Sequence, residues 1–232
     1  MNKIFTAIVL LTTLVSKAQI HLVGQTESII ELSCTVSDYE TLTQGVYTQI
    51  HLKEGNPILQ KGAPDLEKLT TAIVIDDVAQ MEISITHSGY DEYHDIFMLP
   101  SKGNLLRTLN PSDIPFEFGP EYQTDAFFPG ALAKLGRPYI MGHYRGQSVQ
   151  FFPLQYNPVT HVLRVYHDIQ VAISPTAAIG ENALAAVTHP VNRFDEERYQ
   201  SHFINYSGVA DRYQQIDEIG NRYCQIKNWA AV

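Results

Sequence analysis

Residues 148–173, SVQFFPLQYNPVTHVLRVYHDIQVAI, constrain the fold more than any other stretch of the chain. Apolar side chains alternate with polar ones in the second half, with one face made of Leu163, Val165, Ile169, Val171 and Ile173. A period of two predicts a β-strand with one buried face. Asn157-Pro158 interrupts the run, and Pro153 indicates an edge position or a bulge in the preceding limb. The stretch therefore predicts a β-hairpin.

Four earlier segments show the same alternation and are separated by turn signals: residues 27–37, 46–52, 70–76 and 81–86. Short strands spaced in this way predict an all-β fold, an antiparallel β-sandwich over residues 20–174, followed by a linker and a short helix. The inward face of this sandwich should hold Leu32, Cys34, Val36, Ile50, Leu52, Ile73, Ile75, Ile83, Ile85, Leu163, Val165, Ile169 and Val171. The net charge of −9 without a basic cluster excludes a nucleic-acid partner.

The first 18 residues are typical of a secretory signal peptide. Lys3 gives the positive start, residues 4–15 are apolar, and Ser16 and Ala18 are the small residues that a signal peptidase reads. Cleavage is expected between Ala18 and Gln19. A membrane anchor is the alternative, but the apolar run is shorter than the roughly 20 residues that span a bilayer. We therefore expect a secreted protein that is not attached to a membrane after cleavage.

The two cysteines, Cys34 and Cys224, permit one disulfide in an oxidising compartment. Cys34 lies on the apolar face of an expected strand, whereas Cys224 lies in a different kind of sequence near the C-terminus. We expect Cys34 to be a buried free thiol and the two residues to remain unpaired.

The remaining segments connect or follow the strands. Residues 100–120 are rich in proline and should form a long, functional or mobile loop. Residues 131–135 suggest a helical turn, and 174–190 a linker. A helix is expected over 192–206, capped by Asn192, with an apolar stripe of Phe194, Tyr199, Phe203 and Tyr206.

No catalytic or cofactor motif is present, and we expect neither a metal nor a cofactor. His161 and His167 should share a face of one strand but lie too far apart to share a metal. The polar stretch 87–95 lacks the ligand spacing of a calcium loop and should be a solvated loop. Asn205-Tyr206-Ser207 matches the glycosylation pattern, which is short and often matches by chance.

Several separated motifs resemble the N-terminal prodomain of gingipain-type secreted bacterial cysteine peptidases. They are Gly62-Ala63-Pro64, residues 125–129 (DAFFP), Tyr144-Arg145, residues 151–158 (FFPLQYNP), residues 163–173 (LRVYHDIQVAI) and residues 203–206 (FINY). Their order, together with the Asn-Pro hairpin, carries the resemblance over most of the chain. It implies a prodomain that assists folding and keeps its cognate cysteine peptidase domain latent.

The resemblance also implies a domain organisation. Residues 1–18 would be the signal peptide, 19–174 the sandwich, 175–212 the linker and helical tail, and 213–232 the truncated start of a peptidase domain. The bond between Arg212 and Tyr213 matches the family's processing site. The family's catalytic residues would lie farther downstream, so the chain should not be an enzyme by itself. A free-standing secreted module that binds sugars or acts as an adhesin is the alternative.

The resemblance further suggests that a basic side chain enters the specificity pocket of the peptidase as a pseudo-substrate. A carboxylate in such a pocket would pair with a guanidinium in a bidentate fashion. The candidates are Arg137, which we favour because Gly136 and Pro138 predict a projecting turn, then Lys134 and Arg145, and after them Lys102 and Arg107 in the long loop. The alternative is that all of them are ordinary surface charges.

Overall fold

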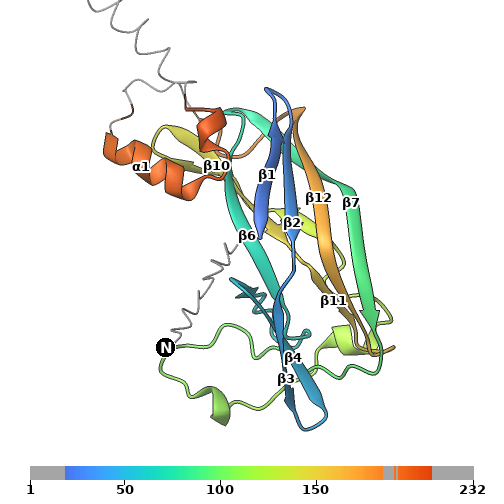
Figure 1. The fold of residues 1–232 in the computed structure, drawn as a ribbon. Helices are drawn as coiled ribbons and strands as arrows, with labels where there is room; N and C mark the ends of the chain where they lie inside the picture. Colours follow the sequence, from blue (N-terminus) through green and yellow to red (C-terminus); the bar gives the residue numbers. More distant parts are fainter. Residues whose placement is uncertain (1–18, 185–190, 192, 211–232) are drawn as a thin grey trace, which may run out of the picture.

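The computed structural model describes residues 19–184, 191 and 193–210 (Figure 1). Two five-stranded antiparallel sheets enclose one core. The first sheet holds β1 (Ile20–Gln25), β2 (Ile30–Thr35), β7 (Ala79–Tyr93), β11 (Leu154–Asn157) and β12 (Val162–Ile179). The second holds β5 (Asn56–Pro57), β6 (Glu67–Val74), β8 (Ala133–Leu135), β9 (Tyr139–Met141) and β10 (Tyr144–Phe151). The predicted all-β sandwich is confirmed.

Three smaller parts complete the fold. A separate ribbon pairs β3 (Tyr39–Gln44) with β4 (Tyr47–Leu52). The helix α1 (Arg193–His202) belongs to a C-terminal tail, and single 3-10 turns lie at Pro111–Asp113, Pro120–Gln123 and Tyr206–Gly208. In the part of the chain that the structure describes, no helix has the length and apolar character needed to cross a membrane.

The strand β12 organises the first sheet, as its alternation predicted. It pairs with β2 and β11 along one edge and with β7 along the other. Its inward side chains, from Leu163 to Ile173, are buried, and they meet Val149 and Phe151 of the second sheet in one core. The burial of alternate side chains in both sheets therefore supplies the apolar contact that holds the layers together.

The limb before the hairpin turn differs from the prediction. It forms two strands rather than one, because the chain leaves the second sheet at Phe151 and enters the first at Leu154. Pro153 lies between them and donates no ladder hydrogen bond, while its carbonyl accepts from the N–H of Tyr166 at 2.8 Å. The proline marks the point where the chain changes sheet.

Two expectations for residues of β7 are wrong, the burial of Ile85 and the loop at 87–95. Ile85 is 42% exposed, whereas Ile83 packs against the core and is partly buried. Among the described strands β7 pairs with β12 alone, so the inward side chains of this edge strand lack a neighbour on one side. The polar stretch 87–95, expected to be a loop, instead continues β7 as far as Tyr93, because its backbone pairs with β12 down to Leu163.

Three other local expectations are also wrong. Residues 133–135 form β8 rather than a helical turn, because they complete the second sheet beside β10. His161 lies in the turn before β12, with φ of 56°, and not on the strand with His167. The predicted linker begins as strand, since β12 continues to Ile179.

No group of three or more potential metal ligands lies together among the described residues.

The C-terminal tail packs against the second sheet through an aromatic cluster. Tyr199, Phe203 and Tyr206 are buried against Tyr144, as expected, but Phe194 is 83% exposed. The predicted helix is too long: α1 ends at His202, so Phe203 and Tyr206 follow the helix and do not belong to a stripe on it. Asn205 fixes the tail to β6, since its side chain accepts from the N–H of Val74 at 2.8 Å and donates to the Val74 carbonyl at 2.9 Å. Asn205 is fully buried, which leaves no room for a glycan. Asn192 lies outside the described residues.

Cys34 should be inert toward thiol reagents in the folded protein. Burial raises its pKa to about 12, and the nearby Asp168 carboxylate adds to the effect. The thiol therefore stays protonated at pH 8. Mass spectrometry after iodoacetamide treatment should find the Cys34 peptide unmodified in the native protein and alkylated in urea. Rapid native alkylation of this peptide would contradict the burial of the thiol.

Candidate inhibitory loops

Arg145 is the most buried of the predicted basic candidates. It lies on β10 with no exposed surface. Its Nη1 donates to the carbonyls of Asp76 and Ala79 at 2.7 and 2.8 Å, and its Nη2 donates to the carbonyl of Glu181 at 2.7 Å. Burial lowers the pKa of Arg145 from its usual value, and the carboxylates of Asp76 and Asp77 oppose this shift. A guanidinium used in this way holds backbone segments together and does not reach toward a partner.

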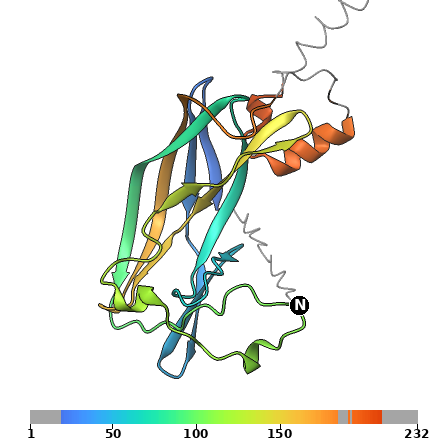
Figure 2. The same cartoon turned by 180° about the vertical axis from the view of Figure 1, so that it is seen from behind.

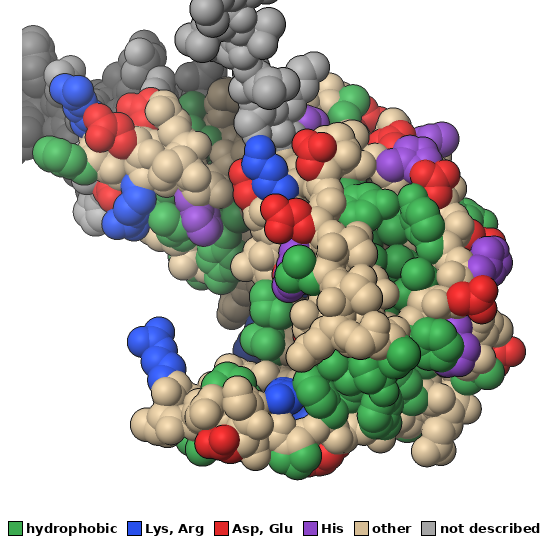
Figure 3. Space-filling model, turned by 60° about the horizontal axis from the view of Figure 1, so that its bottom comes forward, with side chains coloured by type: hydrophobic (Ala, Val, Ile, Leu, Met, Phe, Trp, Pro, Cys, Tyr) green, Lys and Arg blue, Asp and Glu red, His purple; other side chains and the backbone are tan. Residues whose placement is uncertain are grey.

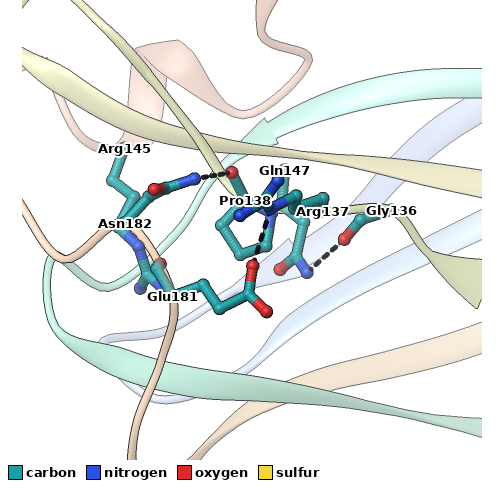
Figure 4. Close-up of polar contacts among 7 residues, drawn as sticks. All are labelled: Gly136, Arg137, Pro138, Arg145, Gln147, Glu181 and Asn182. Carbon is teal, nitrogen blue, oxygen red and sulfur yellow. Dashed lines mark hydrogen bonds and ion pairs between the residues drawn. The ribbon is translucent and has the colours of Figure 1, made fainter.

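Arg137 occupies the turn between β8 and β9, and its side chain is 77% exposed. The exposed turn matches the prediction. However, its Nε lies 2.7 Å from Oε2 of Glu181 (Figure 4). The neighbouring Asn182 donates to the carbonyl of Pro138 at 2.7 Å, which ties the segment after β12 to the same turn. Arg137 is therefore accessible but already paired with a carboxylate.

Lys134 is exposed, but it lies within β8 opposite Gln150 of β10. A residue paired in a strand cannot extend its backbone into a narrow cleft without leaving the sheet. The structure therefore does not bring Lys134, Arg137 and Arg145 together into one projecting loop: one lies on a strand, one in a turn and one in the interior.

The proline-rich segment 100–120 forms a long loop whose two ends meet at Gly62. Gly62 donates to the carbonyl of Ser101 at 2.9 Å and accepts from the N–H of Gly119 at 2.9 Å. Gly62 has φ of 86°, and a Cβ there would lie 3.1 Å from the backbone of Gly119, so the close approach requires glycine. The Gly62-Ala63-Pro64 motif, noted in the sequence, is thus the base of this loop.

Further contacts hold the two ends of the loop, near residues 102 and 111–117, and do not involve the part around residue 107. Lys61 pairs with Glu117 at 2.9 Å, and Nζ of Lys102 donates to the carbonyl of Pro111 at 2.7 Å while lying 4.1 Å from the ring centre of Phe116. The loop extends away from both sheets in two opposite views (Figures 1 and 2). Lys102 is therefore used inside the loop.

Arg107 lies at the exposed part of this loop, next to Leu106, which is 71% exposed, and close to Leu109, which is 44% exposed. Its side chain makes no hydrogen bond, ion pair or ring contact with the residues that the structure describes, in contrast to the other described arginines. The sequence placed Arg107 behind Arg137. The length and proline content of the loop pointed to Arg107 in the sequence. That its guanidinium has no partner in the described part of the chain depends on the tertiary structure and could not be read from the sequence.

Comparison with known proteins identifies the family. Residues 27–203 match the family model Propeptide_C25. The chain is 36% identical over 206 residues to gingipain R2 of Porphyromonas gingivalis, covering 89% of this chain and 26% of that protein. It is 37% identical over 170 residues to gingipain R1 of the same organism, covering 72% of this chain and 16% of that protein. The chain thus spans about a quarter or less of the length of these curated relatives.

Solved structures with a similar fold come from the same group of proteins. A complex of the pro- and mature domains of RgpB from Porphyromonas gingivalis contains a chain with a TM-score of 0.76 and 34% identity, which covers 83% of this chain and 98% of that one. A structure concerned with the zymogenic latency of gingipain K from that organism, at 15% identity, has a TM-score of 0.57, covers 68% of this chain and 93% of that one, and shows a shared fold. No comparison supports the free-standing binding module. By its sequence match and its fold, the chain belongs to the gingipain-type propeptide family of cysteine peptidase precursors.

Proposed function

We propose that this chain binds the cysteine peptidase domain of its own precursor and keeps that peptidase latent until the two parts are separated. The observation that carries the proposal is the fold match, over nearly all of the solved chain, to a protein solved as a complex of pro- and mature domains. The rigid sandwich and the projecting loops give a scaffold that suits this role, because loops on a rigid support commonly make binding contacts.

The arginine that enters the specificity pocket is best supplied by the long loop. Entry requires an exposed guanidinium on a segment that can extend, and a side chain that loses little on leaving its own contacts. Arg107 meets these conditions, while Arg137 must first leave Glu181 and Arg145 is buried. We therefore propose Arg107 as the pseudo-substrate residue and retain Arg137 as the second candidate.

Mixing the purified chain with a mature Arg-specific gingipain and measuring residual peptidase activity tests the proposal. Activity should fall in proportion to added chain until one chain is present per peptidase. Full activity at a large excess of folded chain, against both gingipain R2 and the peptidase from the same precursor, would rule the proposed function out.

We further propose that the precursor is exported and is then cut between Arg212 and Tyr213. Both residues lie outside the described part of the chain, and so does Ala18, where the signal peptide is expected to end. The match of this bond to the family junction supports the site. Arg193 and Arg198 should resist cutting, because both lie in α1, where they pair with Glu197 at 3.4 Å and Asp195 at 4.0 Å. Limited digestion followed by N-terminal sequencing should reveal Tyr213 as a new terminus, ahead of any terminus generated within α1.

A further inference from the structure

The ribbon of β3 and β4 projects from the same end of the molecule as the long loop (Figures 1 and 2). Ile50 and Leu52 are buried at its base, and Thr48 donates to the carbonyl of Phe97 at 2.7 Å, just before the long loop begins. Among the described strands, β3 and β4 form ladders only with each other, while Tyr39 and Leu52 at the base hydrogen-bond to Tyr93 and Glu67. The strand β4 is thus held to the core as far as Thr48, one ladder pair from the turn, while residues 40–46, which make up most of β3 and the turn, are exposed.

The tip is uncharged and carries two exposed apolar side chains. Leu42 is 52% exposed and Val46 is 70% exposed. No charged side chain occurs from Thr41 to Ile50, although 18% of the chain is charged. Exposed strand edges usually carry charges, lysine above all, because an uncharged edge invites pairing with another protein. A two-stranded ribbon is also marginally stable in water by itself. An uncharged, projecting ribbon with apolar side chains at its tip is therefore suited to burial against a partner.

The apolar character continues from the ribbon to the long loop. Large apolar side chains exposed at this end are Leu42, Val46, Phe97, Leu106, Leu109, Phe116 and Phe118. Seen from this end, the molecule shows broad apolar areas beside a hollow (Figure 3). Patches of this kind mark interaction surfaces. Arg107 lies between Leu106 and Leu109 of this set, so a partner that receives the long loop approaches the end of the molecule from which the ribbon also projects (Figure 1).

We infer that the β3–β4 ribbon is a second docking element, which lies against the same peptidase domain that receives the long loop. This inference rests on the proposed function. The loop supplies the charged group that enters the specificity pocket, and the ribbon supplies apolar contact outside the pocket. The ribbon should therefore contribute to affinity and to the lifetime of the complex without contacting the catalytic residues.

Binding of the full chain to mature gingipain R2 tests this inference when Leu42→Asp and Val46→Asp are compared with wild type. Each should raise Kd at least tenfold, mainly through faster dissociation, because a carboxylate would be buried in the interface. Val23→Asp is the matched control, since Val23 is 61% exposed on β1, outside this surface, and its replacement should change Kd less than twofold. All three sites are exposed, so the unfolding midpoints should not change.

Hydrogen exchange of the wild-type complex provides a test that needs no variant. Backbone amides from Thr41 to Val46, which are exposed in the free chain, should exchange more slowly in the complex. If wild type binds, yet both ribbon variants bind within twofold of it and the ribbon gains no protection, the ribbon is not a docking element and the proposed function survives. If wild type itself does not bind, the proposed function fails and the inference fails with it.

Discussion

Replacing Arg145 with alanine should lower the free energy of unfolding by about 3–5 kcal/mol. The substitution removes three hydrogen bonds from a charged donor and leaves the carbonyls of Asp76, Ala79 and Glu181 without it. It also opens a cavity beneath the segment that follows β12. The turn between β6 and β7 and the segment that follows β12 would therefore lose the side chain that joins them.

Arg137→Ala is the matched control for this prediction. Arg137 lies in the same neighbourhood, but its ion pair with Glu181 is mostly exposed, with 77% and 65% of the two side chains accessible. Exposed pairs contribute at most about 1 kcal/mol, so this variant should unfold nearly as wild type does. Arg145→Lys should recover little stability, because an ammonium group cannot replace the planar fork that reaches three carbonyls. Urea unfolding gives all three values. A loss below about 1 kcal/mol for Arg145→Ala would show that the buried guanidinium is not a structural anchor.

Arg107→Ala should weaken inhibition of an Arg-specific gingipain by roughly 30- to 1,000-fold, which corresponds to about 2–4 kcal/mol. Losing one partner of a desolvated, bidentate ion pair leaves the pocket carboxylate unpaired, and this accounts for the size of the effect. The unfolding midpoint should not change, because Arg107 is exposed and its side chain forms no hydrogen bond or ion pair with the described residues. Inhibition constants measured with a small chromogenic substrate give the result.

Two controls make the Arg107 prediction specific. Lys102→Ala removes a charge from the same loop, but Lys102 is held by Pro111 and Phe116, so its loss should change inhibition far less. Arg137→Ala tests the residue that the sequence favoured. If Arg137→Ala abolishes inhibition while Arg107→Ala inhibits like wild type, the β8–β9 turn is the inhibitory element, and Glu181 is the carboxylate it must leave.

The sequence predicted the sandwich because its strongest signals are local. The alternation in β12 and β2 follows directly from the burial of one strand face, so Leu32, Cys34, Leu163 and Val171 were placed correctly. The exposure of Ile85 could not be foreseen, since it depends on β7 lying at a sheet edge. The exposure of Phe194 likewise depends on which face of α1 contacts the sheet.

The candidate site was less predictable, for a related reason. Arg145 looked like any other basic residue, because the carbonyls that bind it come from residues 76, 79 and 181, far away in sequence. Arg137 was correctly expected in an exposed turn, but the sequence did not reveal its pairing with Glu181. The partner class came from the family resemblance, which the match to Propeptide_C25 confirms.

Competition with benzamidine, a small cationic mimic of the arginine side chain, tests the central claim most directly. If an arginine of the chain fills the specificity pocket, the two ligands exclude each other. The apparent inhibition constant of the chain should then rise about tenfold when benzamidine is present at ten times its own dissociation constant. The Arg107→Ala variant should not respond to benzamidine. An inhibition constant of the wild-type chain that stays the same at every benzamidine concentration would contradict occupation of the pocket.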